Sequence, residues 1–279
     1  MKKISRRSFL AASGLSVAAL ALTACGGSSA STASSVASSA ASSEAASTSA
    51  AAGELTTVEA GKLTMATNAA FPPYEMTTDA GEFEGIDIDT AKAIAEKLGL
   101  ELQIDDMDFD AALLSVQQGK ADIVMAGVTV TDERKAVMDF SDSYATGIQS
   151  IIVPEGSDIA SPDDLAGKKI GTQRGTTGYI YCSDDFGDDN VVAYDDGLTA
   201  VQALNNGQVD AVVIDNAPAQ EFIAANPGLK ILDTSYAEED YAIGMAKGSS
   251  LEDAVNAALE ELKADGTLQS IVDKYITAE

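Results

Sequence analysis

Residues 122–144, DIVMAGVTVTDERKAVMDFSDSY, contain the pattern from which the fold can be inferred. The apolar run 123–125 is short enough for a buried strand, and the small residues 126–129 leave backbone N–H groups open to an outside group. Thr131 or Asp132 is then the predicted N-cap of a helix. A strand, a polar tip and a helix in succession are typical of an α/β protein.

Arg134 stands three residues after Thr131, where a capping box would have Glu or Gln. A cation near a helix N-terminus opposes the macrodipole by about 0.3–1 kcal/mol, and a residue that breaks a local rule is a candidate for function. Beyond residue 24, the sequence has only one other arginine, Arg174. Beside open N–H groups, an arginine suits bidentate binding of a carboxylate. The alternative is a surface ion pair.

The N-terminal residues 1–24 have the pattern of an export signal. An apolar stretch, 9–22, is too short to span a membrane and ends at LTACG (22–26), which resembles a lipobox. Cys25 is therefore predicted to become the lipid-modified first residue of a lipoprotein. SRRSFL (5–10) also resembles a twin-arginine signal, so Sec and twin-arginine export both stay open. Residues 25–58 are mostly Ser and Ala, which predicts a flexible linker.

The charge and the residue types exclude several classes of protein. The full chain has a net charge of −27, and removing residues 1–24 takes away four basic and no acidic residues, which leaves −31. So acidic a protein is a poor partner for nucleic acid or anionic lipid. The absence of histidine excludes Ser-His-Asp catalysis and histidine-based zinc sites. Cys182 is then the only free cysteine, predicted to be a half-buried small residue.

Short apolar runs alternate with helical patterns along the chain, which predicts α/β lobes with mixed, mostly parallel sheets flanked by helices. The predicted strands are 63–67, 100–104, 122–125, 169–172, 191–193, 211–214 and 230–232. The predicted helices are 90–98, 111–118, 198–206, 217–225, 251–265 and 268–275, three of them closed by Gly99, Gly119 and Gly207.

An internal echo indicates two similar lobes. GKADIV (119–124) matches GQVDAV (207–212), and in both places a helix, a glycine, an aspartate and a buried strand follow one another. Ligands of open parallel sheets bind beyond the carboxyl ends of the strands. Two such sheets that face each other would place both sets of strand ends in one cleft.

From about residue 62 onward, the chain resembles the bacterial extracellular solute-binding proteins of family 3, the amino-acid-binding proteins of ABC importers. The matching motifs are NAAFPPYE (68–75), GIDID (85–89), DFD (108–110), TDER (131–134), DFSD (139–142), GTT (175–177) and VDA (209–211). The resemblance implies a Venus-flytrap fold of the periplasmic binding protein type II. Lobe 1 would comprise 59–147 with 243–279 and lobe 2 would comprise 148–242, with crossing segments near 148–153 and 241–245.

The same resemblance implies the binding residues. Arg134 would bind the amino acid's α-carboxylate, helped by Thr129 and by backbone N–H groups near Gly127 and Thr177. Asp215 would bind the α-ammonium, although capping the helix from residue 217 is its alternative role. The remaining implied binding residues are the aromatic walls Phe71 and Phe109, and Asn68 and Gln173 toward the side-chain pocket. Tyr74 is expected in the core, and Arg174 beside surface acids.

Asn68 bears on the ligand, because many relatives that take arginine or lysine carry an aspartate at this position. An amide both donates and accepts, which favours a neutral polar side chain such as that of glutamine. Glu75, Asp87 or Asp108 could still bind a cation, so a basic amino acid is the alternative.

Three function classes compete on the sequence: a binding lipoprotein, a secreted cyclohexadienyl dehydratase-like enzyme, and a ligand sensor. The sequence shows no catalytic pair of carboxylates and no signalling segment after Glu279, which favours the first. The expected partners are a free amino acid, an ABC permease and, through the lipid, the membrane. We expect a monomer outside the cytoplasm with no cofactor.

Overall fold

The computed structural model describes residues 55–276. The predicted signal peptide, the predicted lipidation site Cys25 and residues 25–54 of the predicted linker lie outside the described residues. Within the part that is described, no helix combines the length and the apolar character needed to cross a membrane.

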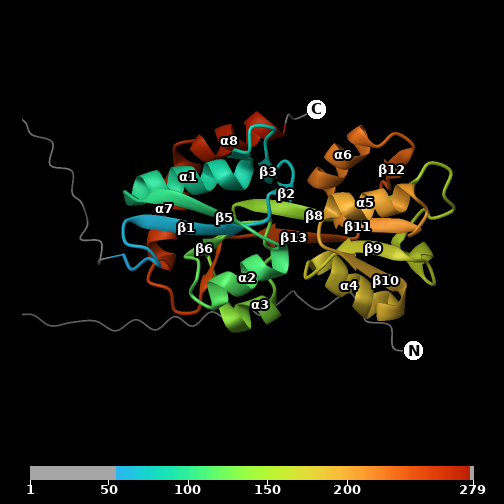
Figure 1. Cartoon of the computed structure of the whole chain (residues 1–279), viewed down its shortest axis with the longest axis horizontal. Coiled ribbons are helices and arrows are strands. Elements are labelled where there is room, and N and C mark those ends of the chain that lie inside the picture. Colours follow the sequence, from blue (N-terminus) through green and yellow to red (C-terminus); the bar gives the residue numbers. More distant parts are fainter. Residues whose placement is uncertain (1–54, 277–279) are drawn as a thin grey trace, which may run out of the picture. The chain divides into compact units, whose positions relative to one another are not determined.

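The first sheet has the strand order β5-β1-β6-β14-β7 (Figure 1). β1 runs parallel to β5 and β6, whereas β14 is antiparallel to β6 and β7. The strands are β1 (Lys62–Thr67), β5 (Glu101–Asp106), β6 (Ile123–Val124), β7 (Met138–Phe140) and β14 (Gly244–Ala246).

Helices cover both faces of this sheet because its central strands are buried on both sides. Leu63 and Met65 of β1 pack in one core with α1, α7 and α8, whereas Ala66 packs in a second core with α2. The helices are α1 (Ile86–Leu98), α2 (Phe109–Gln117), α3 (Asp132–Val137), α7 (Glu252–Ala264) and α8 (Thr267–Tyr275).

The second sheet has the order β10-β9-β11-β8-β12, and β13 also pairs with β8. β9 is parallel to β10 and β11, while β8 is antiparallel to β11, β12 and β13. The strands are β8 (Ala145–Pro154), β9 (Ile170–Gln173), β10 (Val191–Tyr194), β11 (Ala211–Asp215), β12 (Leu229–Ile231) and β13 (Ala237–Tyr241). The helices are α4 (Thr177–Phe186), α5 (Gly197–Asn205) and α6 (Asn216–Ala225), with short 3₁₀ turns at Pro162–Leu165 and Asp188–Asn190.

The two sheets repeat one local arrangement, as the echo predicted. Asp122 accepts a hydrogen bond from the N–H of Thr64 at 2.7 Å, and Asp210 accepts one from the N–H of Lys169 at 2.8 Å. In each lobe, an aspartate before one strand thus holds the beginning of the neighbouring strand. The preceding glycines, 119 and 207, have φ angles of 66° and 68°, a backbone conformation that glycine adopts without strain.

The fold is α/β with mixed sheets, as predicted, but each sheet has an antiparallel half that is more extensive than the sequence indicated. The chain passes from the first sheet to the second before β8 and returns after β13, and these two strands pair antiparallel to each other (Figure 1). A small sheet of β2 (Ala70–Phe71), β3 (Glu75–Thr77) and β4 (Phe83–Glu84) precedes α1.

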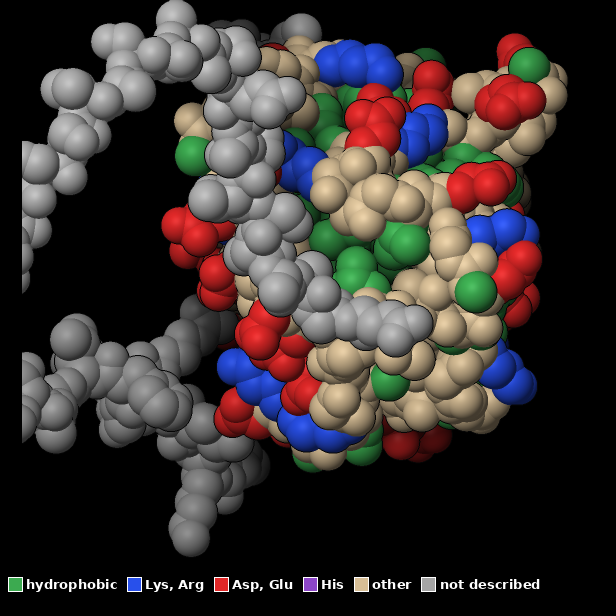
Figure 2. All heavy atoms as spheres, turned by 90° about the vertical axis from the view of Figure 1, so that its left-hand side faces the viewer, with side chains coloured by type: hydrophobic (Ala, Val, Ile, Leu, Met, Phe, Trp, Pro, Cys, Tyr) green, Lys and Arg blue, Asp and Glu red, His purple; other side chains and the backbone are tan. Residues whose placement is uncertain are grey.

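Acidic and basic side chains are interspersed on the face drawn in Figure 2, so the few cations of this acidic chain lie among its carboxylates. Several of them form ion pairs there or elsewhere on the surface, such as Lys274 with Asp89 at 2.7 Å and Lys97 with Glu261 at 3.1 Å. Exposed pairs of this kind contribute little stability.

Candidate functional site

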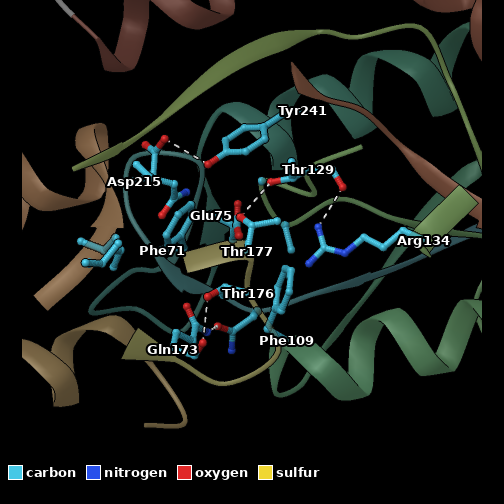
Figure 3. A pocket seen from close by; sticks show the side chains of 16 residues that line it. Phe71, Glu75, Phe109, Thr129, Arg134, Gln173, Thr176, Thr177, Asp215 and Tyr241 are labelled. Atoms are coloured by element: carbon cyan, nitrogen blue, oxygen red, sulfur yellow. Dashed lines mark hydrogen bonds between the residues drawn. The ribbon is translucent and has the colours of Figure 1, made fainter. Parts of the chain in front are cut away.

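All the ligand-binding residues that the sequence predicted line a single pocket, to which both sheets contribute (Figure 3). It has about 430 Å³ of atom-free space, part of which is open solvent. The predicted residues that line it are Asn68, Phe71, Phe109, Gly127, Thr129, Arg134, Gln173, Thr177 and Asp215.

Arg134 is buried at the wall of this pocket, with 8% of its surface exposed. Thr131 is the N-cap of α3, and its hydroxyl accepts from the Arg134 N–H at 3.1 Å, which confirms one of the two predicted caps. The guanidinium donates to the carbonyl of Thr129 at 2.8 Å (Figure 3). It also donates to the carbonyl of Gly175 at 3.1 Å and lies 5.4 Å from the ring centre of Phe109. Within residues 55–276, no carboxylate forms an ion pair with it. The predicted alternative of a surface ion pair is therefore wrong.

Asp215 ends β11 and caps α6 at the same time. Its Oδ1 accepts from the N–H of Ala217 at 3.0 Å, so the predicted capping role is present. Oδ2 accepts from the N–H of Ile148 at 2.8 Å and from the hydroxyl of Tyr241 at 3.0 Å (Figure 3). Burial raises the pKa of Asp215 to about 6, although these hydrogen bonds pull it down. A buried carboxylate of this kind gains from a cationic partner.

The hydroxyls of Thr129 and Thr177 both donate to a residue that the sequence analysis did not name. Oε2 of Glu239, on β13, accepts from Thr129 at 3.0 Å, from Thr177 at 2.9 Å and from Gln149 Nε2 at 3.1 Å. A threonine hydroxyl has a single proton to donate. These hydroxyls are therefore held by Glu239 and present lone pairs, not protons, toward the pocket.

The backbone N–H of Gly127, which was predicted to bind the ligand, already donates a hydrogen bond within the protein. Its N–H donates to Oδ2 of Asp87 at 3.0 Å, so it does not face an outside group as the sequence analysis had expected. Gly127 has a φ of 55°, and a Cβ there would lie 3.0 Å from the Phe71 ring, so a side chain would crowd this wall. Thr177 lies in the first turn of α4, where N–H groups have no partner within the helix.

Asn68 and Gln173 join the two sheets across the pocket. The amide of Gln173 donates to Oδ1 of Asn68 at 2.8 Å, and Nδ2 of Asn68 donates to the carbonyl of Met107 at 3.0 Å. Both amides are therefore partly satisfied by the protein itself. Phe71 and Phe109 line the pocket as well (Figure 3).

Glu75 also lines the pocket. It lies in the motif NAAFPPYE (68–75), but the resemblance did not imply a binding role for it. Its side chain is 0% exposed, and among the described residues neither carboxylate oxygen has a hydrogen-bond partner. Burial, and then Asp87, raise its pKa well above the usual range. The other lining residues missed by the sequence analysis are Ala126, Gln149, Thr176, Val213, Ile214 and Tyr241. Val213 and Ile214 directly precede Asp215 and could have been inferred, whereas Gln149 and Tyr241 had no local signal.

Three further predictions concern residues outside the pocket. Arg174 is exposed and lies 3.6 Å from Asp195, as expected of a surface pair. Tyr74 is buried in the core, also as expected. Cys182 is fully buried rather than half-buried, and burial raises the pKa of its thiol to about 12, which suits a packing role.

Comparison with known proteins agrees with this geometry. Residues 63–278 match the family model of bacterial extracellular solute-binding proteins, family 3. A probable histidine-binding protein of Neisseria gonorrhoeae is 33% identical over 96% of this chain and 95% of its own length. The arginine-, lysine-, histidine-binding protein ArtJ of Geobacillus stearothermophilus is 34% identical, with a TM-score of 0.75 over 78% of this chain and 96% of that one.

An ancestral arginine-binding protein bound to glutamine is 43% identical, with a TM-score of 0.75 over 78% of this chain and 99% of that one. Relatives of this kind are two-lobed amino-acid-binding proteins of ABC transporters, not enzymes. The chain belongs to family 3 of the bacterial extracellular solute-binding proteins.

Proposed function

We propose that this protein binds one free amino acid between its two lobes, with Arg134 on the α-carboxylate and Asp215 on the α-ammonium. The observation that carries the proposal is the state of Arg134, which is buried, held by two main-chain carbonyls and without an ion-pair partner among residues 55–276. A guanidinium has five N–H donors, so donors remain for a carboxylate. Glu239 acts on this charge without forming an ion pair with it, and a buried guanidinium in this state favours a ligand that brings a directly bonded carboxylate.

The opposite charge of Asp215 makes the pocket suitable for a zwitterion. An α-ammonium near this carboxylate would offset the burial that raises its pKa to about 6. The hydroxyl oxygens of Thr129 and Thr177, whose protons point to Glu239, can also accept from the ammonium. Phe71 and Phe109 would then enclose the apolar part of the ligand side chain.

The identity of the side chain rests on two residues that favour different ligands. Asn68, an amide, favours a neutral polar side chain such as that of glutamine. Glu75 favours a basic amino acid as a second candidate, because its buried oxygens have no partner among the described residues. Relatives are named for arginine, cystine and glutamine binding. Both candidates end in N–H donors, which is the chemistry that Glu75 selects.

We infer further that the protein is anchored by lipid at Cys25, outside the cytoplasm, and delivers its ligand as a monomer to an ABC permease. The lipobox and the Ser/Ala linker support the anchor, and the family supports the permease. A linker of this composition would let the folded part turn freely near the membrane.

A thermal-shift screen tests amino-acid binding. Protein freed of carried-over ligand by unfolding and refolding is screened against the common amino acids, cystine and ornithine. A ligand at 100 times its Kd stabilises the protein by about 2.7 kcal/mol, so the melting temperature rises by several degrees. The decarboxylated amine of each hit is the control and should give no shift. A protein that responds to none of the amino acids would refute the proposal.

A further inference from the structure

Two buried carboxyl groups lie next to each other at the pocket: Glu75 lines it, and the N–H of Asp87 donates to the carbonyl of Tyr74, the residue before Glu75, at 2.8 Å. Glu75 is on β3 and Asp87 is in the first turn of α1, and both side chains are 0% exposed. Oδ2 of Asp87 accepts from the Gly127 N–H at 3.0 Å and from the Tyr144 hydroxyl at 2.8 Å. Within residues 55–276, Oδ1 of Asp87 and both oxygens of Glu75 have no hydrogen-bond donor.

The surroundings of the pair are acidic or neutral. No lysine or arginine forms an ion pair with either group within the described residues. The other titratable groups near the pair are Asp106 on β5, Asp215 on β11, Tyr74 beside β3 and Tyr144 before β8. Tyr241 on β13 and Arg134 line the same pocket.

Two buried carboxylates without ion-pair partners cannot both stay ionised at this position. Burial raises the free energy of each charge, and the repulsion between the two charges raises it further. As carboxylates, both groups only accept, so neither can satisfy the other. A single proton changes this, because it makes one group a donor to its neighbour. Burial raises the pKa of Asp87 to about 6 and that of Glu75 well above its usual range, in agreement with one bound proton.

We propose that Glu75 and Asp87 share one proton in the ligand-free protein, and that the pocket exchanges this proton for the positive side chain of a cationic amino acid. The inference rests on the proposed function. On binding, the proton leaves Glu75 for the solvent, and the ligand's side-chain cation takes its place beside the carboxylate. A neutral amide needs no exchange, since it can hydrogen-bond to Glu75 while the proton stays.

The exchange makes the choice of ligand depend on pH. A cationic ligand must displace a proton below the pKa of the pair, so its affinity falls tenfold for each pH unit of acidification. Above that pKa its affinity no longer changes with this pair. A neutral amide shows no such slope from Glu75. Acid therefore favours glutamine over arginine, and alkaline pH favours arginine.

Calorimetry with L-arginine and L-glutamine tests the exchange. Each is titrated at pH 6 in phosphate and in Bis-Tris, because the difference in buffer ionisation enthalpy reports the protons released. Asp215 contributes the same release for both ligands, so the difference between them isolates the pair. We expect arginine to release close to one proton more than glutamine.

Two variants sharpen the test. Asp87→Asn keeps an oxygen for the Gly127 N–H, removes the neighbouring charge and supplies an N–H to Glu75, so the pKa of Glu75 should fall and arginine should release fewer extra protons at pH 6 than it does from wild type. Glu82→Gln removes an exposed carboxylate next to β4 and should behave as wild type. A carboxyl ¹³C NMR titration of the ligand-free wild type should show the pair titrating in two steps, one of them well above the usual carboxyl range.

Equal proton release by the two ligands would overturn the exchange. Binding of glutamine but of no cationic amino acid between pH 5 and 9 would overturn it as well. If both carboxyls ionise near pH 4 in the ligand-free protein, no proton is shared and the proposal fails. The NMR titration needs no ligand, so it decides on the shared proton even if the proposed amino-acid binding is wrong.

Discussion

Arg134 owes its position to main-chain carbonyls and an aromatic ring rather than to acidic side chains. Thr129, which follows β6 of the first sheet, and Gly175, which follows β9 of the second, orient the guanidinium, and Phe109 lies against it. Carbonyls hold the group in place but do not neutralise its charge. The residue is therefore poised for an external carboxylate.

We expect Arg134→Lys to bind the amino acid about ten- to a hundred-fold more weakly. The lysine keeps the charge but loses the planar fork, and a charge-assisted hydrogen bond contributes about 1.5–3 kcal/mol. Arg134→Ala should bind more weakly still. Arg174→Lys is the matched control, since Arg174 is exposed beside Asp195, and it should bind as wild type. Calorimetry on the variants measures this, and near-wild-type binding by Arg134→Ala would end the carboxylate role.

At the scale of the element, the junction of β11 and α6 combines a structural and a binding role in one residue. Asp215 caps α6 and also holds Ile148 and Tyr241. The two roles can be separated because the cap needs an acceptor, whereas an ammonium needs a negative charge.

We expect Asp215→Asn to keep a cap acceptor but to weaken amino-acid binding by at least tenfold, because the charge is lost. Some stability, about 1–3 kcal/mol, should be lost as well, since the amide N–H₂ faces the Ile148 N–H. Asp196→Asn is the control, because Asp196 caps α5 in the same way through the Thr199 N–H at 2.7 Å, outside the pocket. Affinity and urea unfolding are measured on both. If the two variants bind equally well, Asp215 is only a cap.

The same carboxyl predicts a pH dependence of the ligand-free protein. Burial raises its pKa to about 6 in the folded state, against about 3.9 in an unfolded chain. The folded protein therefore holds this proton more tightly, and the contribution of Asp215 to stability falls as the pH rises from about 4 to 6. Compared with Asp215→Asn, wild type should lose stability over this range in urea unfolding. A constant difference between them would contradict the raised pKa.

At the scale of the whole molecule, the pocket depends on contacts between two sheets that the chain joins through β8 and β13. Gln173 and Asn68 meet across it, as do Arg134 and Gly175. We propose that residues 59–147 with 243–279, and residues 148–242, move as two lobes about these crossings.

We expect ligand to draw the two lobes together by hinge bending. Small-angle scattering should then give a smaller radius of gyration with saturating amino acid than without it. Asp215→Asn at the same amino-acid concentration serves as the control and should show less change. An unchanged radius in wild type at saturation would argue against the hinge.

The lipid anchor gives a second prediction at this scale. Wild type expressed in a bacterium should partition with the membrane, whereas Cys25→Ala should be released or kept as uncleaved precursor. Cys182→Ala is the control, as Cys182 is buried in the folded part, and it should partition with the membrane. Mass spectrometry of the mature N-terminus checks the modification. Mature wild type without lipid would exclude the anchor.

The sequence by itself predicted the class of fold and, through the resemblance to the family, nine of the 16 residues that line the pocket. Hydrophobic runs, glycine stops and the repeated GKADIV and GQVDAV segments are local patterns, so they predict strands, helices and two lobes directly. The motif around Arg134 lies at the end of a strand, and strand ends in such folds lie at ligand sites.

Only the tertiary structure decided how the polar groups of the pocket are paired. Asp87 accepts a hydrogen bond from the N–H of Gly127, which is 40 residues distant in the sequence. Glu239 accepts one from the hydroxyl of Thr129, which is 110 residues distant. These partners come from different elements and meet only when the sheets pack. The meeting of Glu75 with Asp87 also depends on that packing, because burial turns two ordinary acids into a pair that competes for one proton.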